Sequence, residues 1–322
     1  MARILAVSSQ VVRGHIGLSA IVPALQALGH EVWPLPTIVL SNHPGHRNAA
    51  GVRTPVDRLD AMLDALSANG WLGEIDAVLT GYLPSAEHAA FAVRAIERVR
   101  QIGSEAIVLV DPVLGDEPKG LYIDPAAAAA IRDTLLPLAD VTTPNRFELG
   151  WLTGRALGTL DEVKAAAMAL GRPSVAVTSA GLRDVHPHPM RGAEGRNGVS
   201  QLSCVSNPPP TPRRHREGNP VEAAASGVTP KAAEILTLLV SADMGSTFAT
   251  RLHPHVPHGT GDLFSGLLLG HLLSRRGMSD AAGRAVAGVA RAIEASLGHD
   301  ELVLAARLHA IASATASAEA AS

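Results

Sequence analysis

Short apolar runs alternate along this chain with longer stretches in which apolar residues recur every three or four positions. This alternation is typical of repeated strand–helix–strand units, which place parallel strands side by side and helices on both faces of the sheet. We therefore predict an α/β fold with one doubly wound, mainly parallel sheet flanked by helices. The predicted strands are 4–8, 31–35, 77–80, 106–110, 141–142, 175–178, 236–240 and 246–250, and the predicted helices are 17–28, 56–68, 85–101, 125–136 and 160–170.

The composition allows a packed interior and argues against several classes of protein. Hydrophobic residues make up 47% and charged residues 18% of the 322 positions, enough apolar material for a sizeable core. A formal net charge of −3 provides no basic field for nucleic acid or an anionic membrane. The single cysteine, Cys204, excludes an internal disulfide, and no apolar run is long enough to span a membrane. We expect a cytoplasmic protein whose partners are small molecules.

One segment interrupts the alternation of strands and helices. Residues 184–231 include Asn207-Pro-Pro-Pro210 and Pro212-Arg-Arg-His-Arg216 and show no sustained strand or helix periodicity. A stretch of this kind within a compact domain predicts a flexible insertion. We therefore expect a single domain over residues 1–322, interrupted by this insertion, with a helical part at 262–311 and a frayed Ala- and Ser-rich tail at 312–322.

The strongest local signal is the motif His258-Gly-Thr-Gly-Asp262, which precedes a long apolar stretch. Gly259, Thr260 and Gly261 can turn their N–H groups toward one point, where the positive end of the following helix also attracts an anion. Such a loop can stabilise the oxygens of a phosphoryl group during transfer. Asp262 can then accept the proton of an attacking hydroxyl group. The alternative is an ordinary helix start, with Asp262 as its N-terminal cap.

Other nucleotide-binding and catalytic motifs are absent from the sequence. The chain has no Gly-Lys pair, which excludes a P-loop, and it lacks Gly-x-Gly-x-x-Gly, Gly-x-Ser-x-Gly and His-Glu-x-x-His. In doubly wound sheets, ligands bind at the carboxyl ends of the strands, so the residues that follow each predicted strand are candidates for a site. That rule selects Ser9, Gly81, Tyr82, Asp111, Pro112, Asn145, Thr178 and Ser179.

Seven short motifs, in their order along the chain, carry a more specific signal. They are Ser8-Ser-Gln-Val-Val-Arg-Gly-His-Ile-Gly17, Val32-Trp-Pro-Leu-Pro-Thr37, Ser41-Asn-His-Pro-Gly45, Thr80-Gly-Tyr-Leu83, Asp111-Pro-Val-Leu-Gly-Asp116, Thr143-Pro-Asn-Arg-Phe-Glu148 and Gly259-Thr-Gly-Asp-Leu-Phe264. Together they resemble the successive motifs of pyridoxal kinases, a family of the ribokinase-like superfamily. The resemblance covers residues 3–180 and 235–295. It implies ATP-dependent phosphorylation of the 5′-hydroxyl group of pyridoxal, with pyridoxine and pyridoxamine as further candidate substrates.

The resemblance also implies a role for each matching residue. Asp262 would be the general base, and Gly259, Thr260 and Gly261 would form the anion hole. The substrate-binding positions would be Ser9, Ile38, Pro44, Gly45, Tyr82 and Asp262, although many members have threonine where this chain has Pro44. The ATP-binding positions would be Asp111, Asp116, Tyr122, Thr143, Asn145, Glu148, Thr178, Ser179, Gly259, Thr260 and Gly261.

The resemblance implies cofactors and a partner as well. Asp111 and Glu148 would lie near the triphosphate, and two carboxylates there repel it unless Mg²⁺ lies between them. Members of the family also use a monovalent cation and tend to form homodimers. In this chain, the apolar face of Leu18, Ile21 and Leu25 is a candidate for the dimer contact, although helix packing explains these residues equally well.

Other functions stay open at this point. Another ribokinase-like enzyme, such as a hydroxymethylpyrimidine kinase or a sugar kinase, would share much of the pattern. A protein that binds pyridoxal without catalysis is a second alternative, against which the retained Asp262, Asp111 and Glu148 argue. A third is an interaction protein that uses the Pro- and Arg-rich segment at 184–231.

Overall fold

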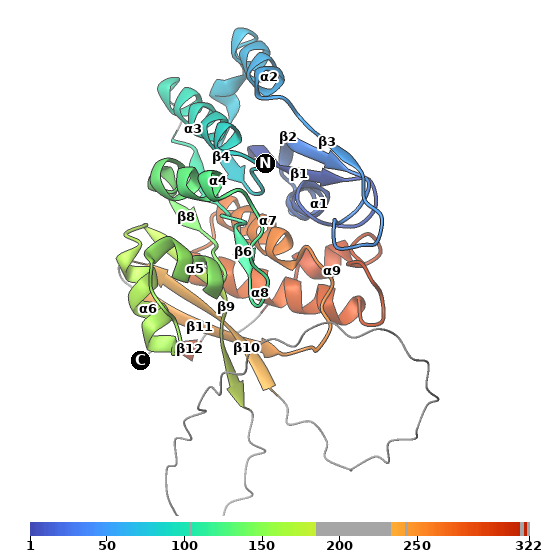
Figure 1. Ribbon diagram of the computed structural model, residues 1–322, viewed down its shortest axis with the longest axis vertical. Coiled ribbons are helices and arrows are strands. Elements are labelled where there is room, and N and C mark those ends of the chain that lie inside the picture. Colours follow the sequence, from blue (N-terminus) through green and yellow to red (C-terminus); the bar gives the residue numbers. More distant parts are fainter. Residues whose placement is uncertain (104, 185–232, 242–243, 316–318, 321–322) are drawn as a thin grey trace, which may run out of the picture. The chain divides into compact units, whose positions relative to one another are not determined.

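The computed structural model describes residues 1–103, 105–184, 233–241, 244–315 and 319–320 (Figure 1). The chain divides into two units, one formed by Met1–Arg183 with Ala233–Ser322, and the other by Asp184–Ala232. The insertion predicted at 184–231 coincides with the second unit and, beyond Asp184, lies outside the described residues. The fold and the site described below belong to the first unit.

The described part of the first unit contains a ten-stranded sheet in the order β12-β11-β10-β9-β8-β5-β4-β1-β2-β3. Its parallel pairs join β2 (Glu31–Leu40), β1 (Arg3–Val11), β4 (Ala77–Thr80), β5 (Ile107–Val110), β8 (Val141–Thr142) and β9 (Ser174–Asp184). Antiparallel strands complete the two edges: β3 (Gly51–Arg53) pairs with β2, and β11 (Met244–Arg251) pairs with both β10 (Ala233–Ser241) and β12 (Glu319–Ala320). The predicted doubly wound, mainly parallel sheet is confirmed.

Helices cover both faces of this sheet because its strands are apolar on both sides. Side chains alternate along a strand, so in β1 Ile4 and Ala6 enter one core and Leu5 and Val7 enter the other. The first core is closed by α1 (Leu18–Ala27), α7 (Thr260–Leu273), α8 (Met278–Ala295) and α9 (Leu308–Ala312). The opposite face is covered by α2 (Val56–Ala68), α3 (Ala86–Gln101) and α4 (Pro125–Ala130), and further along by α5 (Arg146–Thr153) and α6 (Leu160–Ala169).

Several predicted elements have different bounds in the structure. The helix predicted at 125–136 is α-helical only as far as Ala130 and continues as a π turn (Ile131–Leu135) and a 3₁₀ turn (Leu136–Leu138) that contains Pro137. The helical part predicted at 262–311 comprises α7, α8 and α9, but it is interrupted between the end of α8 at Ala295 and the start of α9 at Leu308. Gly298, with a φ of 82°, lies in this interruption. The predictions did not include α5, β3 or the hairpin of β6 (Gly115–Asp116) and β7 (Gly120–Leu121).

Two further predictions concern the surface of the chain. Leu18, Ile21 and Leu25, the candidates for a dimer contact, are fully buried against α7, so packing within the fold accounts for them. In the tail at 312–322, Ala312 and Ala314 are buried and Glu319–Ala320 pairs with β11. Among the residues that the structure describes, no helix combines the length and apolar character that crossing a membrane requires.

Candidate functional site

The anion-binding motif lies at the N-terminal end of α7. Gly259 is the N-terminal cap of this helix and has a φ of 100°, a conformation that other residues rarely adopt. A Cβ atom at Gly259 would overlap the carbonyl oxygen of His15, so the close approach of the two loops also requires glycine. Thr260, Gly261 and Asp262 form the first turn, where backbone N–H groups have no partner within the helix and the helix dipole favours an anion.

Asp262 lies in the third position of α7, so it is not the cap of the helix, which Gly259 supplies. Its carboxylate accepts a hydrogen bond from the Gly17 N–H, at the start of α1. Burial raises the pKa of Asp262 to about 6, against the opposing effect of this hydrogen bond. At the end of β4, a Cβ atom at Gly81 would lie 4.0 Å from Asp262 Oδ1. Asp262 therefore faces the carboxyl ends of the central strands as a carboxylate with a pKa suited to proton transfer near neutral pH.

A chain of hydroxyl groups connects α7 to Asp111, which follows β5. Ser265 Oγ donates to Asp111 Oδ2 at 2.8 Å and lies 2.9 Å from Thr143 Oγ1, and all three side chains are buried. Burial raises the pKa of Asp111 well above its usual range, and the nearby carboxylates of Glu148 and Asp262 add to this effect. The hydrogen bonds from Ser265 and Thr143 oppose it. Acidic side chains from the end of β5, from α5 and from α7 thus lie close enough for two of them to raise the pKa of the third, Asp111.

Ser265 is a residue of the site that the sequence analysis did not identify. It is the one hydroxyl residue in the apolar run Leu263-Phe-Ser-Gly-Leu-Leu-Leu269, and it follows Asp262 by three positions, which places both on the same face of the helix. A polar residue on an otherwise buried helix is the signal that identifies such a position.

Glu148 and Asn145 form a capping box at the start of α5. Glu148 Oε2 accepts from the Asn145 N–H at 2.8 Å, and Glu148 Oε1 accepts from the N–H groups of Leu114 at 2.8 Å and Gly115 at 3.5 Å. Burial raises the pKa of Glu148 to about 7, although these backbone hydrogen bonds lower it. Asn145 Nδ2 donates to the Gly115 carbonyl oxygen at 2.8 Å. Both side chains hold the segment after β5 against α5. Because both carboxylate oxygens of Glu148 already accept hydrogen bonds from the backbone, Glu148 has little capacity left to bind a ligand directly.

Three of the residues predicted to bind ATP, Asp116, Asn145 and Ser179, line a cavity of about 290 Å³. Ser179 has a φ of 50°, an unusual value for a residue other than glycine, and such conformations cluster at ligand sites. Thr178 is fixed beside Asn145 by the hydrogen bond from its N–H to the Pro144 carbonyl oxygen at 3.0 Å.

Tyr122 follows the β6–β7 hairpin and is 49% exposed. Partial burial raises the pKa of Tyr122, and the nearby carboxylates of Glu148, Asp111, Asp262 and Asp116 raise it further. The phenol therefore stays protonated and can donate a hydrogen bond to an anion. Asp116, on β6, has a buried Oδ1 atom with no hydrogen-bond partner among the described residues.

The residues predicted to bind the second substrate lie along β1, β2 and β4. Ser9 pairs with Ile38 in the register of β1 and β2, and Ser9 is buried close to Gly17, whose N–H reaches Asp262. The Tyr82 N–H donates to Ser8 Oγ at 3.0 Å, and its half-buried phenol has a pKa raised by burial. These residues line the same end of the sheet as Asp262.

Pro44 and Gly45 are exposed on the loop between β2 and β3. Their neighbour His43 stacks on His258 with the ring centroids 3.7 Å apart and the ring planes at 15°. Because His258 directly precedes Gly259, this stack joins the loop to the anion-binding turn. The structure thus brings the predicted residues of both substrates to one edge of the sheet.

Within the described ranges, no three His, Cys, Asp or Glu side chains cluster as ligands for a metal ion. The carboxylates of Glu148 and Asp262 nevertheless raise the pKa of Asp111, and all three raise the pKa of Tyr122, so several acidic groups lie close together. A divalent cation at Asp111 would need further oxygen ligands from a polyphosphate and water, because the described residues offer too few.

Comparisons with known proteins relate the chain to a family of small-molecule kinases. A family model described as phosphomethylpyrimidine kinase matches residues 20–182. The chain is 36% identical over 296 residues to a pyridoxine/pyridoxal/pyridoxamine kinase of Bordetella avium, covering 91% of this chain and 81% of that protein. It is 33% identical over 297 residues to the pyridoxal kinase PdxY of Rubrobacter xylanophilus, covering 91% of this chain and 87% of that protein.

Solved structures share the fold. A pyridoxal kinase of Entamoeba histolytica superposes with a TM-score of 0.77 at 20% identity, with 100% of both chains covered. A pyridoxal kinase of Leishmania donovani, in complex with ADP and pyridoxine, superposes with a TM-score of 0.77 at 24% identity, with 99% of both chains covered. The mainly parallel sheet flanked by helices is therefore the ribokinase-like fold.

Proposed function

The chain belongs to the pyridoxal kinase family of the ribokinase-like superfamily, and from this we infer that it transfers the γ-phosphoryl group of ATP to the 5′-hydroxyl group of pyridoxal. The observation that carries this proposal is the position of Asp262 in the first turn of α7, three residues after the Gly259 cap, with a pKa raised to about 6. A base and a site for a phosphoryl group occupy the same helix end, as transfer to an alcohol requires.

In the proposed reaction, Asp262 takes the proton of the 5′-hydroxyl group as its oxygen forms a bond to the γ-phosphorus atom. The bond between the γ-phosphorus and the β–γ bridging oxygen breaks, and ADP leaves with that electron pair. The N–H groups at Gly259, Thr260 and Gly261 stabilise the charge on the transferring phosphoryl oxygens. The hydrogen bond from Gly17 keeps the Asp262 carboxylate oriented while it accepts the proton.

We propose that Mg²⁺ enters this site with ATP, where it would neutralise the phosphate charge. Asp111 would hold it, since its buried carboxylate lies near Glu148 and Asp262 and no basic side chain among the described residues forms an ion pair with it. Glu148 would act through its charge or through water, because its oxygens already accept three backbone hydrogen bonds.

The remaining predicted residues fit the two substrates. Asp116, Tyr122, Asn145, Thr178 and Ser179 surround or adjoin the cavity of about 290 Å³ and would contact ATP. Thr143 would act through Ser265 on Asp111. Pyridoxal would lie against Ser9, Ile38, Pro44, Gly45 and Tyr82, between the strand ends and the loop that follows β2.

An activity assay tests the proposed function directly. The full chain is incubated with ATP, Mg²⁺ and pyridoxal, and pyridoxal 5′-phosphate is measured by its absorbance. Hydroxymethylpyrimidine and a sugar serve as competing substrates, since the matching family model is named for phosphomethylpyrimidine kinase. Faster turnover of either competitor would refute the choice of pyridoxal, and binding of pyridoxal without turnover would refute catalysis.

A second test concerns the buried hydroxyl group beside Asp111. We expect Ser265→Ala to lower kcat/KM by about 10- to 100-fold, the usual cost of removing a residue that orients a metal ligand. The free energy of unfolding should also fall by about 1–3 kcal/mol, because Asp111 and Thr143 lose a buried partner. The measurements are steady-state kinetics at several Mg²⁺ concentrations and denaturant unfolding.

Ser246→Ala is the matched control for this variant. Ser246 is also buried, on β11, and its Oγ lies 3.3 Å from Ser279 Oγ at the start of α8, outside the candidate site. A similar loss of stability with unchanged kcat/KM is expected. Equal losses of activity in both variants would show that Ser265 serves packing alone.

The proposal extends to the assembly and location of the protein. We propose a homodimer in the cytoplasm, with one complete site in each protomer. Sedimentation velocity of the purified chain measures its oligomeric state, and a single monomer-sized species at micromolar concentration would refute the homodimer.

A further inference from the structure

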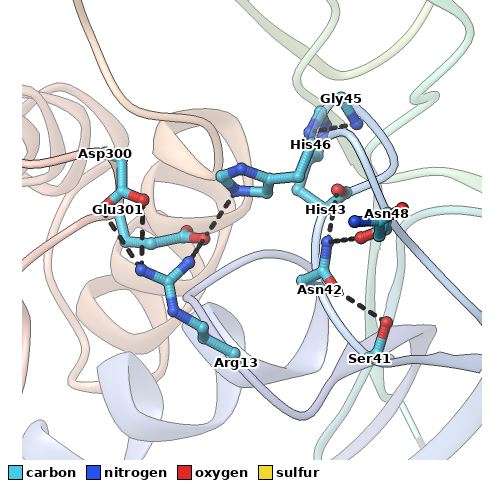
Figure 2. A network of polar contacts seen from close by, with 9 residues as sticks. All are labelled: Arg13, Ser41, Asn42, His43, Gly45, His46, Asn48, Asp300 and Glu301. Atoms are coloured by element: carbon cyan, nitrogen blue, oxygen red, sulfur yellow. Dashed lines mark hydrogen bonds and ion pairs between the residues drawn. The ribbon is translucent and has the colours of Figure 1, made fainter.

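Glu301 connects two loops that border the site. Its Oε1 atom accepts from Arg13 Nη1 at 2.9 Å and lies 3.0 Å from His46 Nε2. Figure 2 shows the Glu301 carboxylate between the Arg13 guanidinium group and the His46 ring. Arg13 belongs to the loop between β1 and α1, His46 to the loop between β2 and β3, and Glu301 to the segment between α8 and α9.

The surroundings of Glu301 indicate a built contact rather than a chance pair of surface charges. Its side chain is only 13% exposed, whereas that of the adjacent Asp300, which also pairs with Arg13, is 66% exposed. Gly14 has a φ of 98°, and a Cβ atom there would overlap the Glu301 carboxylate. Exposed ion pairs contribute little to stability. A largely buried carboxylate that pairs with side chains from two loops can hold both loops in place.

The first of these loops leads to the catalytic end of α7. After Arg13 and Gly14, the carbonyl group of His15 packs against Gly259, and the Gly17 N–H donates to Asp262. The position of the general base therefore depends on the conformation of residues 12–17.

The second loop carries Pro44 and Gly45. Hydrogen bonds from Asn42 Nδ2 to the carbonyl oxygens of His43 at 3.1 Å and Asn48 at 3.0 Å fix the shape of this loop (Figure 2). The loop is attached to the rest of the fold by the Arg13 N–H, which donates to the Ser41 carbonyl oxygen at 2.9 Å, by His43 stacked on His258, and by His46 on Glu301. Because only the last of these attachments involves Glu301, removing Glu301 should release His46 and the adjacent part of the loop without unfolding it.

We propose that Glu301 is a positioning residue that holds the loops 12–17 and 41–48 in the arrangement that accepts pyridoxal. This inference rests on the proposed function, since it concerns the same site. Glu301 acts through Arg13 and His46 on the pyridoxal side of the site. The residues around the ATP cavity, such as Asn145 and Ser179, lie on other elements and do not contact it.

The test compares Glu301→Ala with Asp300→Ala in the full chain. We expect Glu301→Ala to raise the KM for pyridoxal by about tenfold, the size expected for loss of charge-assisted hydrogen bonds, while the KM for ATP changes less than twofold. Asp300→Ala should change neither value, because Asp300 is exposed and does not contact His46. Thermal unfolding of each variant checks that the fold is retained.

A double-mutant cycle gives a second, independent measurement. His46→Ala alters an exposed loop and should fold even if Glu301→Ala does not, and it should raise the KM for pyridoxal in the same direction. If both residues act through one contact, the double variant will be no worse than Glu301→Ala alone. Additive effects, an unchanged KM for pyridoxal in both single variants, or equal increases in both KM values would overturn the inference.

The wild-type chain separates this inference from the proposed function. If the wild type does not phosphorylate pyridoxal, the proposed function fails, and the role of Glu301 in accepting pyridoxal fails with it. If the wild type is active and the variants retain its KM for pyridoxal, only the role of Glu301 is refuted.

Discussion

Asp262→Asn is expected to lower kcat for pyridoxal phosphorylation by about 10²–10⁴-fold, the usual cost of removing a general base. The asparagine side chain has nearly the same shape and can still accept the hydrogen bond from the Gly17 N–H, so the geometry of the helix end should be kept. The loss would then reflect the missing proton acceptor. Steady-state kinetics with saturating ATP provides the measurement, and turnover within a few-fold of the wild type would contradict the assignment.

The pH dependence of the two proteins gives a sharper version of this test. Asp262 is active as a base only when it is ionised, so wild-type kcat/KM should fall as the pH decreases through about 6, the pKa to which burial raises this carboxyl group. The Asp262→Asn variant should lack this acidic limb. A variant that keeps the same limb would assign it to another group, such as Glu148, whose pKa is raised to about 7.

The stability of the same variant should change in the opposite direction to its activity. Because burial raises the pKa of Asp262 from 3.8 to about 6 on folding, ionisation costs stability. This cost grows as the pH rises from about 4 to about 6 and is constant above that range. Asp262→Asn should therefore unfold at a higher temperature than the wild type at pH 8, and the difference should shrink toward pH 4. If Asp262→Asn unfolds at a lower temperature than the wild type at pH 8, the ionised carboxylate stabilises the fold.

Gly259→Ala is expected to lower kcat by about 10²–10³-fold, comparable to the loss of one donor from an anion hole. Two effects act together at this position. The φ of 100° strains any residue with a Cβ atom by about 1–3 kcal/mol, and the new methyl group would overlap the His15 carbonyl oxygen. The first turn of α7 must shift to relieve that overlap, which turns its N–H groups away from the phosphoryl group.

Gly29→Ala is the matched control for this prediction. Gly29 has a φ of 82° in the turn after α1, but no atom lies within 4 Å of a Cβ placed there. It should therefore lose stability through backbone strain alone and keep its activity. If the two variants lose equal stability and both keep wild-type kcat, the anion hole does not depend on the Gly259 backbone.

The fold could be predicted closely because its signal is local. The strand at 77–80 and the helix at 56–68 have the predicted bounds, since buried parallel strands and amphipathic helices leave clear patterns in the sequence. Two-residue strands such as β6 and β7 contain no period and were missed for that reason. The eight-residue helix α5 was also missed, although Asn145 and Glu148, three positions apart, form a capping-box pattern that marks its start.

The anion-binding turn and its aspartate were determined by the sequence itself. Glycine at 259 and 261 and an acid at 262, placed before an apolar helix, specify that turn through backbone freedom and the helix dipole, whatever surrounds it. The tertiary structure alone decided which distant groups meet there: Gly17 on Asp262, Ser265 on Asp111, and Glu301 between two loops. Those contacts join residues up to 288 positions apart, and no local pattern encodes a hydrogen bond between side chains that only the packing of the sheet brings together.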